Sequence, residues 1–269
     1  MKIKHIFTDM DGTLLDSHGV LSDTNHWAIH YSTLPITLVS ARSPIEMNDV
    51  LDTLQLSTPQ IAFNGNLTFT QNQFGIQILD KFPLNSEAVF QILAYVSKEF
   101  PKLSLNWYSL AHWYTNKQDK GTFIQKALTG IAPRIKPFDG QSEIYKIMII
   151  GFDQNDLFQL QNQLNQLEIP NLSIQQSAQH YLEITSNKRT KATAVQSILD
   201  DEDLDFTQIA AIGDDQNDIP LLKVAGLAIA VDNADSEVKK HVKMVVAKNT
   251  EHGVAKAISA INTFNEQVI

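Results

Sequence analysis

The sequence has 269 residues, of which 43% are hydrophobic, and a formal net charge of −9 at pH 7. The length is sufficient for two domains, while the acidic balance disfavours binding to nucleic acid or to an anionic membrane, because both need basic surface. The absence of cysteine excludes disulfides and thiol chemistry. No apolar run reaches the roughly 20 residues of a membrane span, and no signal-peptide pattern precedes the first strand, so we expect a cytoplasmic protein.

An apolar strand near the N-terminus runs directly into two carboxylates, Asp9 and Asp11, and a Gly-Thr turn follows at once. Residues i and i+2 of a strand point the same way, and two acids this close raise one pKa unless a cation lies between them. The same pattern also fits a solvated turn at the end of a strand, since Asp and Gly are common turn residues. The rest of the chain decides between the two interpretations.

Strand-like and helix-like segments alternate after this stretch, which is the pattern of a parallel sheet covered by helices. The second helix has the clearest start, because Ser43 caps it, Pro44 lies in its first turn and Glu46 completes a capping box. We predict helices over 22–33 and 43–54, and strands over 35–40, 61–63, 67–70 and 74–79.

Between residues 82 and 183 the pattern changes to that of an α+β unit with an antiparallel sheet. We predict helices there over 86–100, 122–128 and 153–167, and strands over 103–108, 112–116, 144–152, 172–176 and 181–185. The alternating pattern returns with helices over 191–199, 219–224 and 236–241 and from 253, and strands over 208–214, 227–231 and 243–247. The predicted fold is α/β, a Rossmann-like doubly wound parallel-sheet core (1–82 and 184–269) with an α+β domain (83–183) inserted.

Several polar residues fall at or near the carboxyl ends of the predicted parallel strands, where ligands bind in open α/β sheets. Besides the two N-terminal acids they are Ser40, Lys191 at a helix start, and the acidic run 214–218. Each has an ordinary interpretation as a cap, a solvated lysine or a turn. Together, acids, a hydroxyl and a lysine are what phosphoryl transfer with a divalent metal requires.

Two of these stretches resemble motifs of a known family. The run from Asp9 to Leu15 is similar to the first motif of the haloacid dehalogenase superfamily, and Gly213 to Asp218 is similar to the fourth. The spacing and the inserted block resemble the Cof-type phosphatases with a large α/β cap, and the similarity includes Asn64-Gly65 and Asn233-Ala234. The chain departs from the family in having Ala41 and Ala192 where glycine is usual, and alanine does not adopt a positive φ cheaply.

The resemblance implies a role for each residue type. Asp9 would be the nucleophile that forms an aspartyl-phosphate, and Asp11 the general acid/base. Lys188 is a competing candidate for the lysine of the family's third motif, but the spacing of Lys191 from Glu183 fits that motif better. The implied ligands are Ser40, Lys191 and Asn217 for the substrate phosphate, and Asp9, Asp11 (through its backbone carbonyl), Asp214 and the supporting Asp218 for Mg²⁺.

We therefore predict a Mg²⁺-dependent phosphatase of small phosphorylated metabolites, such as a sugar phosphate or a cofactor phosphate, that is a monomer or a weak homodimer. The alternatives are a phosphotransferase or mutase with the same intermediate, and a phospho-receiver or binding protein without turnover. The cap of such enzymes chooses the substrate. The cap contains four aromatic residues close in sequence: Trp107, Tyr108, Trp113 and Tyr114. They either line a substrate pocket or form the core of a hairpin.

Overall fold

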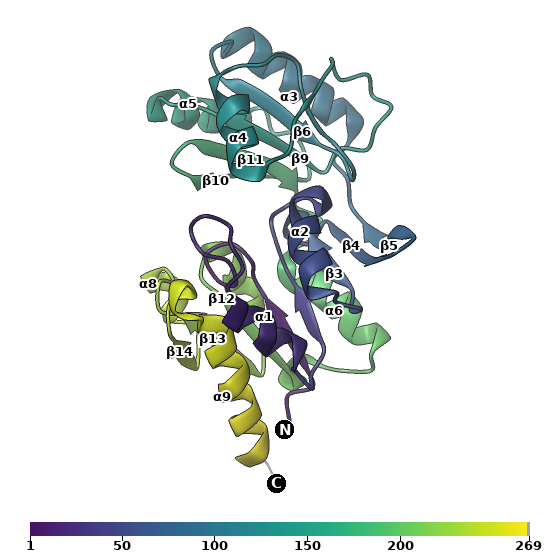
Figure 1. Cartoon of the computed structure of the whole chain (residues 1–269). Helices are drawn as coiled ribbons and strands as arrows, with labels where there is room; N and C mark the ends of the chain where they lie inside the picture. Colours follow the sequence, from purple (N-terminus) through teal and green to yellow (C-terminus); the bar gives the residue numbers. More distant parts are fainter. Residues whose placement is uncertain (268–269) are drawn as a thin grey trace. The chain divides into compact units, whose positions relative to one another are not determined.

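The protein is described by a computed structural model that covers residues 1–267, and its contacts divide the chain into two compact units (Figure 1). The core unit comprises Met1–Ala41, Met47–Asp80 and the described chain from Arg189 onward. The inserted unit comprises Arg42–Glu46 and Lys81–Lys188. The main segment of the inserted unit therefore begins after Asp80, and the chain re-enters the core unit at Arg189.

The core unit is built on a five-stranded sheet in which every neighbouring pair is parallel. Its order is β14-β13-β12-β1-β2, so the first strand of the chain lies inside the sheet and the later strands extend to one side of it. The strand order reverses between β1 and β12. The strands are β1 (His5–Thr8), β2 (Ile36–Leu38), β12 (Ile209–Gly213), β13 (Leu227–Val231) and β14 (Met244–Val246).

Helices cover both faces of this sheet, because alternate side chains of buried parallel strands point to opposite faces. On one face Phe7 and Ala211 belong to a buried apolar cluster with Val195 and Leu199 of α6 and Leu222 of α7. Helix α9 lies outside that cluster and packs against β12, β13, β14 and α1. The helices of this unit are α1 (Asp23–His30), α2 (Pro44–Leu54), whose first residues group with the inserted unit, α6 (Lys191–Asp201), α7 (Ile219–Leu222), α8 (Ser236–Lys239) and α9 (Gly253–Gln267).

A smaller antiparallel sheet follows α2. It consists of β3 (Gln60–Ala62), β4 (Leu67–Asn72) and β5 (Gly75–Lys81) in that order, and a parallel bridge between Val39 and Ile61 links it to the main sheet. Short 3-10 helices are η1 (Phe63–Gly65), η2 (Phe206–Gln208), η3 (Gln216–Asp218) and η4 (Asn249–Glu251). None of the described helices is long and apolar enough to cross a membrane.

The inserted unit contains a six-stranded, mostly antiparallel sheet with helices α3 and α5 packed on one face. Leucines of α5, spaced three or four residues apart, meet apolar residues of the central strands in one buried cluster. The elements are α3 (Ser86–Glu99), β6 (Ser104–Tyr108), β7 (Trp113–Thr115), α4 (Lys120–Thr129), β8 (Arg134–Ile135), β9 (Lys146–Ile150), α5 (Gln154–Gln166), β10 (Leu172–Ala178) and β11 (Tyr181–Ser186). The predicted α/β class with an added antiparallel unit is confirmed. The two-residue strand β8 was not predicted.

The four aromatic residues of the predicted hairpin are interior residues of the inserted unit. Trp107 and Tyr114 belong to its apolar cluster, and Trp113 donates a hydrogen bond from Nε1 to Asn106 Oδ1 at 2.9 Å. Tyr108 is also buried, and burial raises the pKa of its hydroxyl well above the usual range. Packing of the hairpin accounts for all four side chains.

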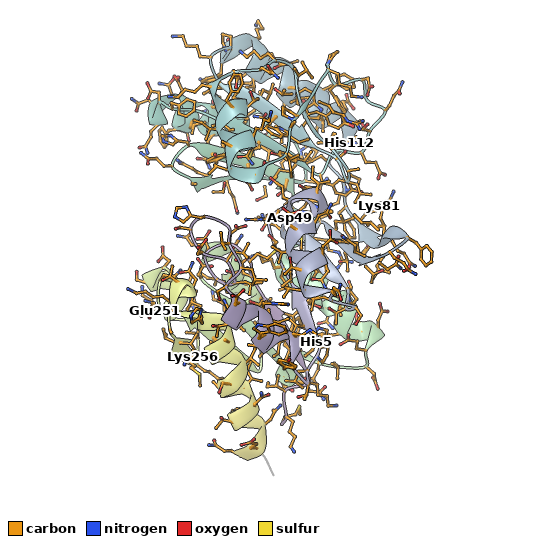
Figure 2. All side chains as sticks on the ribbon, in the orientation of Figure 1. His5, Asp49, Lys81, His112, Glu251 and Lys256 are labelled. Carbon is orange, nitrogen blue, oxygen red and sulfur yellow. The ribbon has the colours of Figure 1, made fainter. Side chains whose placement is uncertain are left out.

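The end of the core sheet away from the carboxyl termini of its strands is closed by a buried histidine, His5, which is labelled in Figure 2. Its Nδ1 lies 2.7 Å from Glu202 Oε2 and its Nε2 lies 3.0 Å from Thr37 Oγ1. Burial lowers the pKa of His5, although Glu202 opposes this effect. This polar group is structural, because it lies at the opposite end of β1 from Asp9.

Candidate active site

Two carboxylates lie at the carboxyl ends of adjacent core strands, at the point where the strand order reverses. Asp9 directly follows β1, and Asp214 directly follows β12, its parallel neighbour. The backbone N–H of Asp9 donates to Ile212 O at 2.9 Å, so the two strand ends are tied together. Ligands of doubly wound sheets bind at such a switch point, because the loops on either side of it diverge and leave a crevice.

Lys191 joins the two acidic segments. It is the first residue of α6 and is buried, and its Nζ lies 2.6 Å from Asp9 Oδ1 and 2.6 Å from Asp218 Oδ1. Thr190 caps the helix by accepting a hydrogen bond from the backbone N–H of Thr193, which fixes where the helix begins. Lys188 is exposed, so the structure brings Lys191 and not Lys188 to the acids.

Asp218 is held from both ends. Its Oδ1 accepts from Lys191, while its Oδ2 accepts backbone N–H groups of Asp214 and Asp215 at 3.0 and 3.1 Å. A Cβ added to Gly213 would lie 2.6 Å from Asp218 Cγ, so only glycine fits at the end of β12. Asp218 therefore fixes the loop that carries Asp214.

The Gly12-Thr13 turn packs against the Asp214 side chain and donates a hydrogen bond to it. Thr13 Oγ1 donates to Asp214 Oδ1 at 2.5 Å, and Gly12 has φ +78°. A Cβ on Gly12 would lie 2.2 Å from Asp214 Oδ2, so both the conformation and the space require glycine. Asn233 Nδ2 donates to Gly12 O at 2.7 Å. The contacts of Thr13 and Asn233 were not predicted, although both belong to motifs that the sequence displays.

Three carboxylates and one ammonium group make the site strongly acidic. Oxygens of Asp9, Asp214 and Asp218 lie within 4.8 Å of one another, and with Lys191 they sum to −2 when all are ionised. Burial raises the pKa of Asp9 well above its usual range despite Lys191, and burial raises the pKa of Asp214 to about 7 despite the Thr13 hydrogen bond. Burial alone would lower the pKa of Lys191, but Asp218 and Asp9 raise it above its ordinary value. A compact set of hard oxygen donors with excess negative charge fits Mg²⁺.

The remaining predicted residues lie around this cluster. Ser40 is buried two residues beyond the end of β2, and its backbone O accepts from Asn64 N at 3.0 Å. Asn217 lies in η3 and donates from Nδ2 to Asn64 Oδ1 at 3.1 Å. Asp11 is exposed and is not one of the three clustered carboxylates. The sequence marks Asn64 only as part of an Asn-Gly pair.

The two alanines that replace glycines of the family pattern fit the backbone. Neither Ala41 nor Ala192 has a positive φ, so no conformation here needs glycine. Ala192 lies in the first turn of α6 and packs against the apolar cluster of the core unit. The departures leave Lys191 at the acids.

Comparison with known proteins identifies the family of the chain. Residues 6–258 match the family described as haloacid dehalogenase-like hydrolase. A Haemophilus influenzae protein provisionally named a phosphatase is 30% identical over 95% of this chain and 97% of its own length. The 5-amino-6-(5-phospho-D-ribitylamino)uracil phosphatase YwtE of Bacillus subtilis is 29% identical over 96% of this chain and 98% of its own. A solved haloacid dehalogenase-like hydrolase from Bacteroides thetaiotaomicron superposes with a TM-score of 0.87 at 24% identity, covering 97% of this chain and 100% of that one.

The chain belongs to the haloacid dehalogenase-like hydrolases, since the family pattern covers most of its length. The predicted family membership and the prediction of an enzyme of hydrolase class are confirmed. The roles of individual residues remain predictions.

Proposed function

We propose that the chain is a Mg²⁺-dependent phosphatase that hydrolyses small phosphorylated metabolites through an aspartyl-phosphate on Asp9. The observation that supports this proposal most strongly is the buried contact of Lys191 with Asp9 and Asp218, beside Asp214. A single ammonium group does not balance three acids, and a site for phosphate transfer has to accept further negative charge. A divalent cation resolves both problems.

Asp9 would act as the nucleophile. Lys191 binds its Oδ1, and no described residue donates a hydrogen bond to Oδ2, so we assign the attack on phosphorus to Oδ2. As the Oδ2–P bond forms, the bond from phosphorus to the leaving oxygen breaks, and Asp11 donates a proton to that oxygen. Asp11 then removes a proton from the water that attacks phosphorus, which releases inorganic phosphate and regenerates the Asp9 carboxylate.

The phosphoryl oxygens would be bound by three groups: the Ser40 hydroxyl, the Lys191 ammonium and the Asn217 amide. Mg²⁺ would be held by Asp9, Asp214 and the backbone carbonyl of Asp11, with Asp218 in support. When bound, it would neutralise charge on the nucleophile and on the phosphoryl oxygens. Asp9 would attack in its ionised form, which is also the form that binds a cation, although burial raises its pKa in the metal-free protein.

The substrate would be a sugar phosphate or a cofactor phosphate. Relatives with assigned substrates include YwtE and the pyridoxal phosphate phosphatase YbhA of Escherichia coli, which is 22% identical over 96% of this chain. We propose that the inserted unit chooses among such compounds. It offers a buried lysine, Lys146, whose Nζ lies 3.6 Å from Glu183 Oε1 on the neighbouring strand and 4.9 Å from the centre of the Tyr108 ring.

The proposal is tested by p-nitrophenyl phosphate hydrolysis, with released inorganic phosphate measured beside p-nitrophenol. Activity should vanish after EDTA treatment and return with Mg²⁺. Full activity in chelator would contradict the role of the metal. Release of p-nitrophenol without inorganic phosphate, with the phosphoryl group on an added alcohol, would identify a phosphotransferase instead.

A further inference from the structure

The turn at η1, Phe63–Gly65, has an unusual backbone. Three consecutive residues have positive φ: Phe63 at 52°, Asn64 at 58° and Gly65 at 102°. A positive φ is uncommon for a bulky side chain, and Phe63 is fully buried. Such a conformation is unfavourable and persists only where the surrounding structure enforces it, which is frequent next to functional sites.

The turn contacts all three residues to which we assign the substrate phosphate. The backbone N–H of Asn64 donates to Ser40 O at 3.0 Å, and the Asn64 side chain accepts from Asn217 Nδ2 at 3.1 Å. A Cβ on Gly65 would lie 2.4 Å from Thr190 O and 3.1 Å from Lys191 N, so glycine lets the turn pack directly on the start of α6. One three-residue turn thus joins elements that are distant in the sequence.

The amide of Asn217 is only half satisfied. Its Nδ2 donates to Asn64, but its Oδ1 is buried and has no hydrogen-bond partner among the described residues. A buried unpaired carbonyl oxygen is unfavourable. Rotating the amides of Asn64 and Asn217 together by 180° keeps their hydrogen bond with donor and acceptor exchanged, because the two ends of an amide have the same shape. The Asn217 amino group then takes the unpaired position, and an anionic ligand atom there would accept from it.

We propose that the Phe63–Gly65 turn is a positioning element for the phosphate-binding groups, and that Asn64 holds the Asn217 amide so that its amino group donates to a phosphoryl oxygen. Asn64 is a positioning residue in this scheme, because it acts through Asn217. The inference rests on the proposed phosphatase function. It adds a residue to which no motif assigns this task.

The test compares Asn64→Gly, Asn217→Ala and the double variant in the Mg²⁺-loaded enzyme. Glycine keeps the positive φ and removes only the side chain, so the turn is expected to fold. The probe is inorganic phosphate, measured as the competitive inhibition constant against p-nitrophenyl phosphate. Each single substitution should raise that constant about tenfold, the effect of one hydrogen bond to a charged group, and the double variant should show no further rise. Asn72→Gly, at the exposed last residue of β4, should leave it unchanged.

A purely structural role of Asn64 would lower the melting temperature and leave the phosphate inhibition constant alone, and that result would overturn the inference. A phosphate inhibition constant raised about a hundredfold in the double variant would overturn the inference too. The effects of the two substitutions would then multiply, which means that Asn64 acts independently of Asn217. If the wild-type protein itself neither hydrolysed p-nitrophenyl phosphate nor bound phosphate, the proposed function would fail as well. An active wild type with an unaffected Asn64→Gly variant would overturn the inference alone.

Discussion

Replacing Asp214 with asparagine should stabilise the metal-free protein while abolishing its activity. Burial raises the pKa of this carboxyl from an ordinary 3.8 to about 7. The folded pKa lies above the unfolded one, so the carboxyl adds full stability below pH 3.8 and loses it progressively as the pH rises to about 7. At 1.36 kcal/mol per pKa unit, the cost of ionisation is about 4 kcal/mol at pH 8 and below about 2 kcal/mol at pH 5.

The Asp214→Asn substitution removes this charge. An asparagine Oδ1 still accepts the Thr13 hydrogen bond, but the new amino group needs an acceptor near Gly12, which offsets part of the gain. We expect the free energy of unfolding in EDTA to rise by about 2–4 kcal/mol at pH 8 and by less than half of that at pH 5. Urea unfolding followed by circular dichroism measures both values. Phosphatase activity with Mg²⁺ should be lost.

Asp201→Asn is the matched control, because Asp201 is exposed on α6. It should change neither the pH dependence nor the activity. Mg²⁺ should stabilise the wild type at pH 8 far more than it stabilises Asp214→Asn. A gain of the same size at both pH values, or no gain at pH 8, would refute the electrostatic reasoning.

Two further predictions concern the lysine and the inserted unit. Lys191→Met should lower kcat/KM by at least about 100-fold and reduce the melting temperature. The reason is that Asp9 and Asp218 lose the only cation in contact with them among the described residues. Wild-type kinetics in this variant would contradict the assignment. Replacing residues 83–183 with a short linker should leave a folded core that binds Mg²⁺ and no longer discriminates among a panel of sugar phosphates, nucleotides, pyridoxal phosphate and flavin mononucleotide. An unfolded product by circular dichroism would count against an independent inserted unit.

The parallel core was predictable because its strands are short apolar runs between helices with clear caps. The acids were predictable too, since Asp9 and Asp214 each follow such a run directly. Chain order alone places both at the edge where ligands bind. The pKa values of the two acids could not be predicted from the sequence. They depend on burial and on Lys191, and α6 brings Lys191 to the acids from a distant part of the chain.

The supporting contacts were much harder to predict. An Asn-Gly pair indicates a turn, but nothing in the sequence indicates a positive φ at Phe63, which tertiary packing imposes. Lys146 looks like an ordinary polar residue at the start of a strand, and only the structure shows that it is buried beside Glu183. Strand β8 was missed because two residues carry no periodicity.

In the proposed mechanism Asp9 carries the phosphoryl group, and trapping the phosphoenzyme is the decisive test. In Asp11→Asn the first step should continue with p-nitrophenyl phosphate, since p-nitrophenolate leaves without a proton, while hydrolysis slows by about 10²- to 10⁴-fold without the base. Rapid quench and mass spectrometry should then find a phosphoryl group on Asp9 after a burst of p-nitrophenol, and Asp9→Asn should show neither. A phosphoryl group on Asp11, or a burst from Asp9→Asn, would contradict the assignment of the nucleophile.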